Sequence, residues 1–344
     1  MFFLSAFKTT AVATIQIFLV GLLGFLLVRR NFLSSEGLNV LSRFIIEITL
    51  PIFIFCALIK DFSFSLYPNW WIFPILSLII TALGLAIGYI FIGLDKGISQ
   101  KRQFLSLVAF QNSGWLPLPL VAALLPEAEA RVLFIYIVMF LLGFNLVIWS
   151  FGVWLLSERT IYPVRKFVST SPQSFSIMVK NLLSNGVKNF ELGSLFSPPV
   201  IATGLSLLFI ALGINKWMPA AILKPLKMLG DCTLPLAMIV VGANLGGIAM
   251  RGEDNNREIL YVVLAKLMVL PLIVFIILFS FPLPYLVKLL VIIQASMPAA
   301  TNLSIICRHY KVEDRLVTKA IFWTHVASII TIPLVLALFK SVAF

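Results

Sequence analysis

Two segments in opposite halves of the chain place polar side chains beside prolines inside long apolar stretches. The first reads Gln111-Asn112-Ser113-Gly114-Trp115-Leu116-Pro117-Leu118-Pro119, and the second reads Gln294-Ala295-Ser296-Met297-Pro298-Ala299-Ala300-Thr301-Asn302. Proline lacks an N–H and clashes with the carbonyl group four residues earlier, so each helix is expected to bend or break there. Broken helix ends present N–H groups and a positive dipole, which favour a small anion such as a carboxylate. The matched pair therefore predicts an anion site, although a single proline kink is more often a packing feature.

Two acidic residues lie within apolar stretches, and each follows a basic residue by four positions. Glu47 follows Arg43, and Asp231 follows Lys227. Residues four apart share one face of a helix, so each pair can form an ion pair that lowers the free-energy cost of burying charge. This structural interpretation is the simpler one, since a basic partner keeps the acid ionised. Proton-linked gating by the two acids is the alternative.

Two further ionisable residues, Lys266 and His325, lie within apolar stretches of the second half. Lys266 could attract a substrate anion or neutralise a buried acid, and the sequence favours neither role. His325 could relay protons, because histidine titrates near neutral pH. A packing histidine with one hydrogen bond to a neighbouring helix is the simpler interpretation.

Membrane-spanning helices must position these residues, because the composition excludes a soluble enzyme. Of the 344 residues, 60% are hydrophobic and 12% are charged, whereas soluble domains average roughly 25% charged residues. A transmembrane helix needs roughly 20 apolar residues. The apolar runs predict ten spans, at 9–28, 39–59, 70–93, 102–125, 132–156, 198–214, 226–249, 259–280, 284–307 and 317–339.

The distribution of charge predicts how the chain crosses the membrane. The formal net charge of +12 is interpreted as loop charge and not as a sign of a nucleic-acid partner. Most Lys and Arg residues outside the spans lie in the odd-numbered connections, above all in 157–197. We therefore expect a multi-pass inner- or plasma-membrane protein with both termini outside and a cytoplasmic linker at 157–197. The three cysteines show no metal or disulfide spacing, and neither metal nor cofactor is expected.

The two halves of the chain, 1–156 and 198–344, share a pattern. Five predicted spans precede the linker and five follow it, so the second half must enter the membrane from the opposite side. Thr49-Leu50-Pro51 in the second span matches Thr233-Leu234-Pro235 in the seventh. The polar-proline segments match at nearly the same separation along the chain. The sequence thus predicts an all-α protein built from two inverted five-helix repeats, an architecture of many secondary transporters.

Several short motifs, in their order and spacing, resemble the auxin efflux carrier family over essentially the whole chain. They are Asn112…Leu116-Pro117-Leu118-Pro119, Thr233-Leu234-Pro235-Leu236 with Gly242-Ala243-Asn244-Leu245, Met297-Pro298-Ala299-Ala300 and Thr331-Ile332-Pro333-Leu334. The resemblance implies that spans four and nine cross at their breaks. It also implies a scaffold domain of spans one, two, six and seven and a transport domain of the other six. A homodimer formed through the scaffold and an elevator-like motion are further implications.

The resemblance assigns site residues when it is carried over position by position. Asn112 is then the asparagine of the crossover. The implied substrate site, with its neighbours, comprises Gln111, Asn112, Ser113, Pro117, Pro119, Gln294, Ser296, Pro298, Thr301 and Asn302. The short linker departs from the long regulatory loop of the plant exporters, which puts auxin itself in doubt as the substrate.

The leading hypothesis is a secondary transporter that exports a small organic anion, either an auxin-like carboxylate or a dicarboxylate. An enzyme is not expected, because the sequence contains no HExxH, GxSxG or Walker A motif. A sodium-coupled carrier like the bile-acid symporters is one alternative, although 284–307 holds no Asp or Glu. A sensor that binds ligand on the same fold without transporting it is another.

Overall fold

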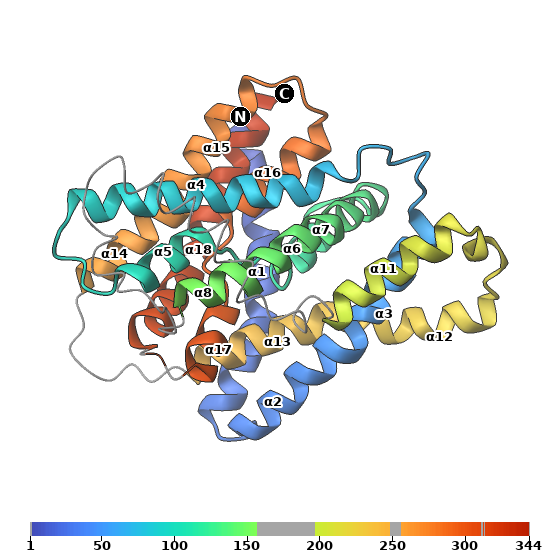
Figure 1. Ribbon diagram of the computed structural model, residues 1–344, viewed down its shortest axis with the longest axis horizontal. Helices are drawn as coiled ribbons and strands as arrows, with labels where there is room; N and C mark the ends of the chain where they lie inside the picture. The colour runs from blue at the N-terminus through green and yellow to red at the C-terminus, as the bar shows by residue number, and fades with distance from the viewer. Residues whose placement is uncertain (1, 157–196, 248–255, 311, 313, 344) are drawn as a thin grey trace.

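The computed structural model describes residues 2–343 except 157–196, 248–255, 311 and 313. Over these residues the chain is helical, and its one β-type pairing is an isolated bridge between Gln111 and Ala299 (Figure 1). The first half forms α1 (Phe2–Arg29), α2 (Ser35–Phe44), η1 (Ile45–Thr49), α3 (Leu50–Asp61), α4 (Ile72–Leu94), α5 (Lys101–Ala109), α6 (Pro117–Leu124), α7 (Glu127–Val147), η2 (Ile148–Gly152) and α8 (Val153–Leu156).

The second half contains a similar number of short and long helices. They are α11 (Pro198–Ala211), η4 (Ile214–Trp217), α12 (Ala220–Asp231), α13 (Thr233–Gly246), α14 (Asn256–Leu264), η5 (Ala265–Val269), α15 (Leu270–Phe279), α16 (Tyr285–Ser296), α17 (Asn302–His309) and α18 (Arg315–Ala343). Of the short elements, η1, η2 and η5 are π-helical turns and η4 is a 3-10 turn.

Seven helical segments among the described residues are long and apolar enough to cross a membrane. They are Phe3–Arg29, Ser35–Asp61, Ile72–Leu94, Glu127–Leu156, Ala220–Gly246, Asn256–Phe279 and Arg315–Val342. Each overlaps one of the ten predicted spans. The described chain is therefore all-helical and consistent with a polytopic membrane protein.

The other three predicted spans are not single long helices. Within 198–214, α11 has 14 residues, and its length is about 21 Å at the usual rise per residue. That length is below the roughly 30 Å of a bilayer's hydrocarbon core. Predicted spans 102–125 and 284–307 are each divided into two shorter helices, α5 with α6 and α16 with α17.

Prolines inside two of the long segments follow a wider helical turn. Pro51 lies in the first turn of α3 directly after η1, and Pro271 lies in the first turn of α15 directly after η5. In η1 the N–H of Leu50 donates to the carbonyl of Ile45, five residues back. This spacing relieves the clash between a proline ring and the carbonyl four residues earlier. Both segments therefore continue past the proline as helix.

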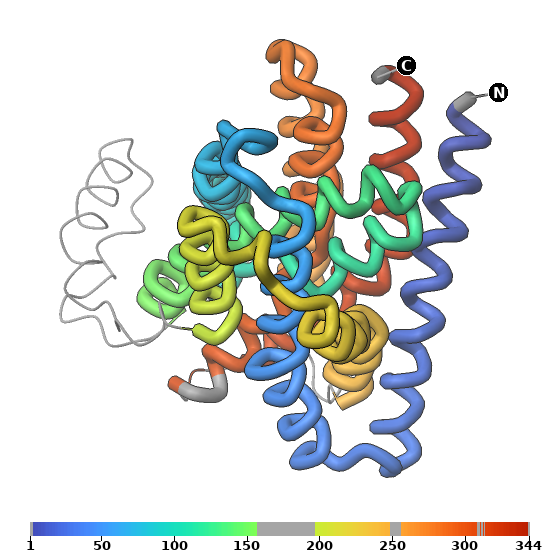
Figure 2. The backbone as a smooth tube through the Cα atoms, turned by 90° about the vertical axis from the view of Figure 1, so that its right-hand side faces the viewer, coloured from blue at the N-terminus to red at the C-terminus, as the bar shows by residue number. Residues whose placement is uncertain are grey.

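The first helix packs along much of its length against both α13 and the last helix, α18. The contact between α1 and α13 is so close that it requires glycine. A Cβ atom on Gly242 would lie 1.7 Å from the carbonyl oxygen of Gly21, and one on Gly24 would lie 1.9 Å from that of Ile239. Figure 2 shows α1 and α18 side by side and running in opposite directions, with both chain ends at the same end of the molecule.

Polar contacts hold the connection between α4 and α5 against the start of α14. Arg257 forms a 3.0 Å ion pair with Asp95. Buried Glu258 accepts hydrogen bonds from the backbone N–H of Ser99 at 2.8 Å and from its hydroxyl at 2.9 Å. Helices from the two halves are therefore joined at the predicted cytoplasmic ends of spans three, four and eight.

Candidate functional site

The first break in the chain lies between α5 and α6. Helix α5 ends at Ala109 because Phe110 is extended, with φ −97° and ψ 118°. Helix α6 begins at Pro117, the first helical position, where the missing N–H of proline has no helical partner to lose. Residues 110–116 between the two helices are not helical.

The second break lies between α16 and α17. Helix α16 ends at Ser296, and Met297 is extended with φ −72° and ψ 143°. The cause is Pro298, since a proline disfavours the helical conformation of the residue before it. Helix α17 begins at Asn302 after the non-helical residues 297–301.

The two breaks cross and pair with each other through the backbone. The N–H of Asn112 donates to the carbonyl of Pro298 at 2.8 Å, and the N–H of Ala300 donates to the carbonyl of Phe110 at 3.0 Å. These bonds flank the antiparallel bridge between Gln111 and Ala299. Segments more than half the chain apart in sequence are thereby joined at one point.

The pairing changes which N–H groups an anion could use. The sequence-based expectation was that both breaks leave their amide hydrogens free, but the crossing engages those of Asn112 and Ala300. The N–H of Ala299 donates to the Thr324 hydroxyl at 3.3 Å, and α6 has prolines at its first and third positions. The backbone N–H groups without a partner among the described residues include those of Ser113, Gly114, Trp115, Thr301 and Asn302.

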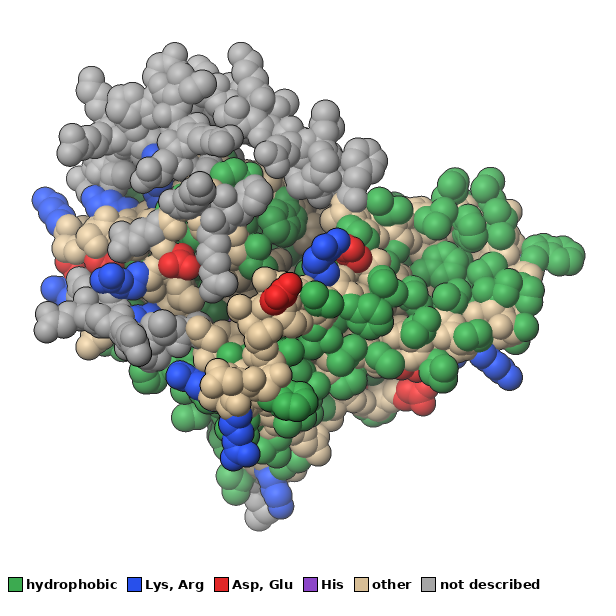
Figure 3. Space-filling view, turned by 90° about the horizontal axis from the view of Figure 1, so that it is seen from below, with side chains coloured by type: hydrophobic (Ala, Val, Ile, Leu, Met, Phe, Trp, Pro, Cys, Tyr) green, Lys and Arg blue, Asp and Glu red, His purple; other side chains and the backbone are tan. Residues whose placement is uncertain are grey.

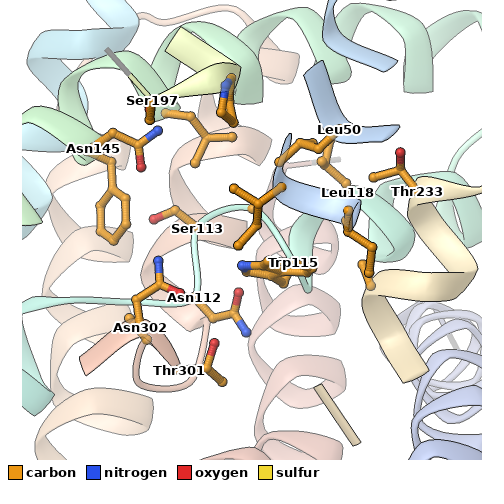
Figure 4. A pocket seen from close by; sticks show the side chains of 18 of the residues that line it. Leu50, Asn112, Ser113, Trp115, Leu118, Asn145, Ser197, Thr233, Thr301 and Asn302 are labelled. Carbon is orange, nitrogen blue, oxygen red and sulfur yellow. The ribbon is translucent and has the colours of Figure 1, made fainter. Parts of the chain in front are cut away.

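A pocket of about 400 Å³ lies beside the crossing. Its walls come from η1, α3, residues 111–115, α6, α7, η2, residues 197 and 199, α13 and residues 300–305. Figure 4 shows Asn112, Thr301 and Asn302 together on one side, and Asn145 and Ser197 on another. The described lining contains no Lys, Arg, Asp or Glu, and much of it is aromatic or aliphatic.

Six of the ten predicted site residues line this pocket: Gln111, Asn112, Ser113, Pro119, Thr301 and Asn302. The other four do not line it. Pro298 supplies the carbonyl that Asn112 binds, and Pro117 begins α6. The side-chain amide of Gln294 donates to the carbonyl of Ser113 at 3.0 Å. The hydroxyl of Ser296 donates to the carbonyl of Ile292 within its own helix.

Several buried amide atoms at the crossing have no hydrogen-bond partner among the described residues. Both side-chain polar atoms of Gln111 are unpaired, and so are Oδ1 of Asn112 and Oε1 of Gln294. All three side chains are buried. Leaving a buried polar group without a partner typically costs about 1–3 kcal/mol. Gln111 and Asn112 line the pocket, so water or a ligand there is the natural partner for their free atoms.

Lys266 lies apart from the pocket and has a structural contact. Its ammonium group is fully buried and donates to the carbonyl of Val108 at 2.8 Å, in the last turn of α5. The break leaves that carbonyl without a helical partner, and the positive charge complements the negative end of the helix dipole. The observed contact is with a backbone carbonyl, and the two roles considered from the sequence, attraction of an anion and neutralisation of an acid, stay predictions.

The two acid–base pairs lie on the outside of the protein chain. Arg43 and Glu47 are 3.0 Å apart, and Lys227 and Asp231 are 2.6 Å apart. The side chains of the two acids are 47% and 53% exposed, and neither lines the pocket. These contacts are the intrahelical ion pairs of the simpler interpretation.

Comparison with known proteins places the chain among transporters. Residues 9–336 match the family described as "Membrane transport protein". The chain belongs to this family. It is the family of the auxin efflux carriers, so the resemblance seen in the motifs is confirmed. Because it is a family of transporters and not of enzymes, the expectation that the chain is no enzyme is confirmed as well.

Two plant proteins of this family are similar to the chain over nearly its whole length. Protein PIN-LIKES 1 of Arabidopsis thaliana is 23% identical over an alignment of 370 residues including gaps. The alignment covers 94% of this chain and 77% of that protein. Protein PIN-LIKES 7 of Arabidopsis thaliana is 21% identical over an alignment of 399 residues including gaps. The alignment covers 99% of this chain and 100% of that protein.

Among the pocket residues that were not site candidates, three carry a signal in the sequence. Asn145 is a lone amide in an apolar part of α7, and a polar residue within a membrane helix is itself a sign of function. Thr233 lies in the Thr-Leu-Pro motif, which served as evidence for a repeat and for the family resemblance but not for a site. Trp115 lies inside the first polar-proline segment, but its aromatic side chain was assigned no role there. All three line the pocket.

Proposed function

We propose that this protein is a secondary transporter that carries a small organic anion with an apolar body across the membrane. The observation that carries the proposal is the pocket of about 400 Å³ beside the crossing of two broken helices. Its volume lies in the range usual for small-molecule sites, which is roughly 300–1,000 Å³. Membership of a family of membrane transport proteins favours a transported ligand.

The two sides of the pocket suit the two ends of such a ligand. The unpaired N–H groups of Ser113 and Gly114, and those that begin α17, are hydrogen-bond donors for a carboxylate. The N-terminus of α17 adds the positive end of its dipole. Trp115, Phe144 and Trp149 line the pocket with aromatic surface. This division favours an auxin-like monocarboxylate over a dicarboxylate, whose second charge would face apolar side chains.

The proposed mechanism is alternating access by an elevator-type motion. We take the ten predicted spans as two inverted five-helix repeats, with spans one, two, six and seven as the scaffold. In support, η1, α3 and α13 of the proposed scaffold line the pocket opposite residues of the crossing, α7 and α17. Motion of the remaining spans would carry the crossing and its ligand past the scaffold. A homodimer through the scaffold and net export across an inner or plasma membrane complete the proposal.

Transport in reconstituted vesicles tests this function. The purified protein is placed in liposomes, and uptake of radiolabelled indole-3-acetate is compared with uptake of malonate and of neutral indole-3-acetamide. The expected result is saturable uptake of indole-3-acetate that unlabelled indole-3-acetate inside the vesicles accelerates, with little uptake of the amide. Faster uptake of malonate would make the substrate a dicarboxylate.

A pair of asparagine variants tests whether transport depends on the pocket. Asn302→Ala removes an amide that lines it, and the loss of a hydrogen bond to a charged group, typically about 1.5–3 kcal/mol, lowers affinity by about tenfold or more. Asn69→Ala, in the exposed connection between α3 and α4, is the matched control and should transport normally. Equal activity of both variants would contradict the site.

Other outcomes separate the competing functions. Binding of indole-3-acetate without flux would contradict transport and favour a sensor. Uptake that stops when sodium is replaced by potassium would favour a sodium-coupled carrier. Flux that neither saturates nor responds to internal substrate would indicate a channel.

A further inference from the structure

We propose that His325 sets the direction of the Asn112 side-chain amide, so that binding of an anion in the pocket is coupled to uptake of one proton by His325. The inference rests on the proposed anion site and adds its coupling ion. It follows from two hydrogen bonds of the buried imidazole ring and from one atom that lacks a partner.

The ring nitrogens of His325 have unequal neighbours. Nδ1 lies 2.8 Å from the carbonyl oxygen of Ile321. A carbonyl oxygen can only accept, so Nδ1 must carry a hydrogen. A neutral imidazole has one N–H, which leaves Nε2 as an acceptor. Nε2 lies 3.3 Å from Nδ2 of Asn112, so the asparagine amide donates to the histidine.

In this arrangement the side-chain oxygen of Asn112, and not its NH₂ group, is the atom left for a ligand. With its nitrogen turned to His325, Oδ1 of Asn112 is buried and has no hydrogen-bond partner in the part of the chain that the structure describes. Asn112 lines the pocket, and Figure 4 shows its oxygen pointing towards Trp115. An amide oxygen accepts hydrogen bonds and carries partial negative charge. While His325 is neutral, this position therefore opposes a carboxylate.

Protonation of His325 reverses the polarity of the amide. A proton taken from solution onto Nε2 makes both ring nitrogens donors. Nε2–H then needs an acceptor, and Oδ1 of Asn112 becomes that acceptor when the amide turns over. The turn directs the Asn112 NH₂ group towards the pocket as a donor to the anion. The terminal amide torsion is nearly two-fold, so both orientations fit the same space.

The charge state of His325 depends on the ionisable groups of α18 and of the elements packed against it. α18 packs against α1, α5, α14, η5, α16 and α17. Lys266 of η5 is buried, with its ammonium bonded to Val108. The others on these elements, and on α18 itself, are Lys8, Arg29, Lys101, Arg102, Arg257, Glu258, Tyr261, Tyr285, Lys288, Cys307, Arg308, His309, Arg315, Lys319 and Lys340.

The crossing itself supplies no counter-charge for an imidazolium. Residues 110–116 and 297–301 contain no Asp or Glu, and the described pocket lining contains none either. A bound carboxylate is therefore the negative charge available next to the Asn112–His325 pair. Anion and proton stabilise each other in this low-dielectric site, so they bind together. A monocarboxylate carried this way crosses the membrane without net charge.

Calorimetry measures the coupling directly. Indole-3-acetate is titrated into the purified protein between pH 6.5 and 8, where its carboxylate stays ionised, in buffers of different ionisation enthalpy. The wild-type protein should take up about one proton per bound anion, and Kd should rise by up to about tenfold per pH unit. His325→Gln keeps a hydrogen-bonding amide but cannot titrate, so its Kd should not depend on pH. His309→Gln, which changes the chain's other histidine, should behave as wild type.

Nitrogen NMR gives a readout that a merely structural histidine would not move. His309→Gln protein with ¹⁵N-labelled histidine reports His325 alone. Without ligand it should show the Nδ1–H tautomer, and with saturating indole-3-acetate both nitrogens should become protonated. Binding with an unchanged spectrum and no proton uptake would overturn the coupling and leave the proposed transporter intact. Failure of indole-3-acetate and of malonate to bind at any pH would overturn both.

Discussion

At the scale of single residues, the site is built from amides and not from charges. Two of the ionisable residues that the sequence singled out lie elsewhere: Lys266 bonds to the end of α5, and Glu47 forms a half-exposed ion pair. Gln111 and Asn112 are buried in the pocket wall with atoms that have no partner. Because an amide is a donor at one end and an acceptor at the other, its orientation decides which ligand the wall accepts.

Replacement of Lys266 tests whether a buried cation recognises the substrate. Lys266→Gln keeps a donor for the Val108 carbonyl and removes the positive charge. Lys266 does not line the pocket, so the Kd for indole-3-acetate, measured by calorimetry, should change by less than about twofold. A Kd raised tenfold or more would assign Lys266 to anion attraction instead. Lys266→Met leaves the carbonyl unpaired and should lower the melting temperature, since an unpaired buried group costs about 1–3 kcal/mol.

Residue types and spacing were sufficient to find the part of the pocket wall that the crossing supplies, because polar groups beside proline stand out in apolar stretches. They did not reveal which backbone N–H groups would be free. That depends on pairing between Asn112 and Pro298, whose separation along the chain hides the contact. The contribution of Asn145 was hidden for a similar reason, since only the packing of α7 brings it to the pocket.

At the scale of elements, prolines have two different outcomes. Pro51 and Pro271 follow π-helical turns and the helix continues, whereas Pro117 and Pro298 accompany breaks. The difference lies in the backbone pairing. Before Pro51 and Pro271 the backbone bonds within its own helix through a wider turn, whereas at the breaks it pairs across the crossing. Sequence patterns predicted where the helices would be interrupted, but the length of each interruption came from tertiary contacts.

A pair of glycine variants tests the contact between α1 and α13. In Gly242→Ala the new methyl group would meet the backbone oxygen of Gly21, which cannot move aside as a side chain can. Overpacking of this kind typically costs about 1–3 kcal/mol, so the melting temperature in detergent should fall. The control is Gly204→Ala in α11, where a Cβ meets nothing within 4 Å. It should be neutral or stabilising by up to about 1 kcal/mol, and a larger loss there than at Gly242 would contradict the packing.

At the scale of the whole molecule, the connections between helices lie in separate regions. Figure 1 places the connection between α4 and α5 at the left and the turn between α1 and α2 at the bottom, whereas α11 and α12 meet at the right. Figure 3 shows the lower face with Lys and Arg mostly at its left and lower edges and hydrophobic side chains over its right part. This division supports the proposed orientation, in which basic connections face the cytoplasm.

Cysteine labelling in intact cells tests the orientation. Cys56, Cys232 and Cys307 are first replaced by alanine, and single cysteines are then introduced by Lys96→Cys and Lys216→Cys at two exposed positions. A membrane-impermeant maleimide should label position 216 in intact cells and position 96 only after permeabilisation. The reverse pattern would place both termini in the cytoplasm.

The bridge between Gln111 and Ala299 also has a consequence for biosynthesis. A ribosome that has made only the first half of the chain has produced one segment of the pair, so Asn112 and Phe110 still lack the backbone partners that Pro298 and Ala300 provide. The crossing is thus completed only after translation passes Ala300. In a nascent chain truncated before Ala300 the carbonyl of Phe110 will lack this partner, however well the earlier helices are inserted.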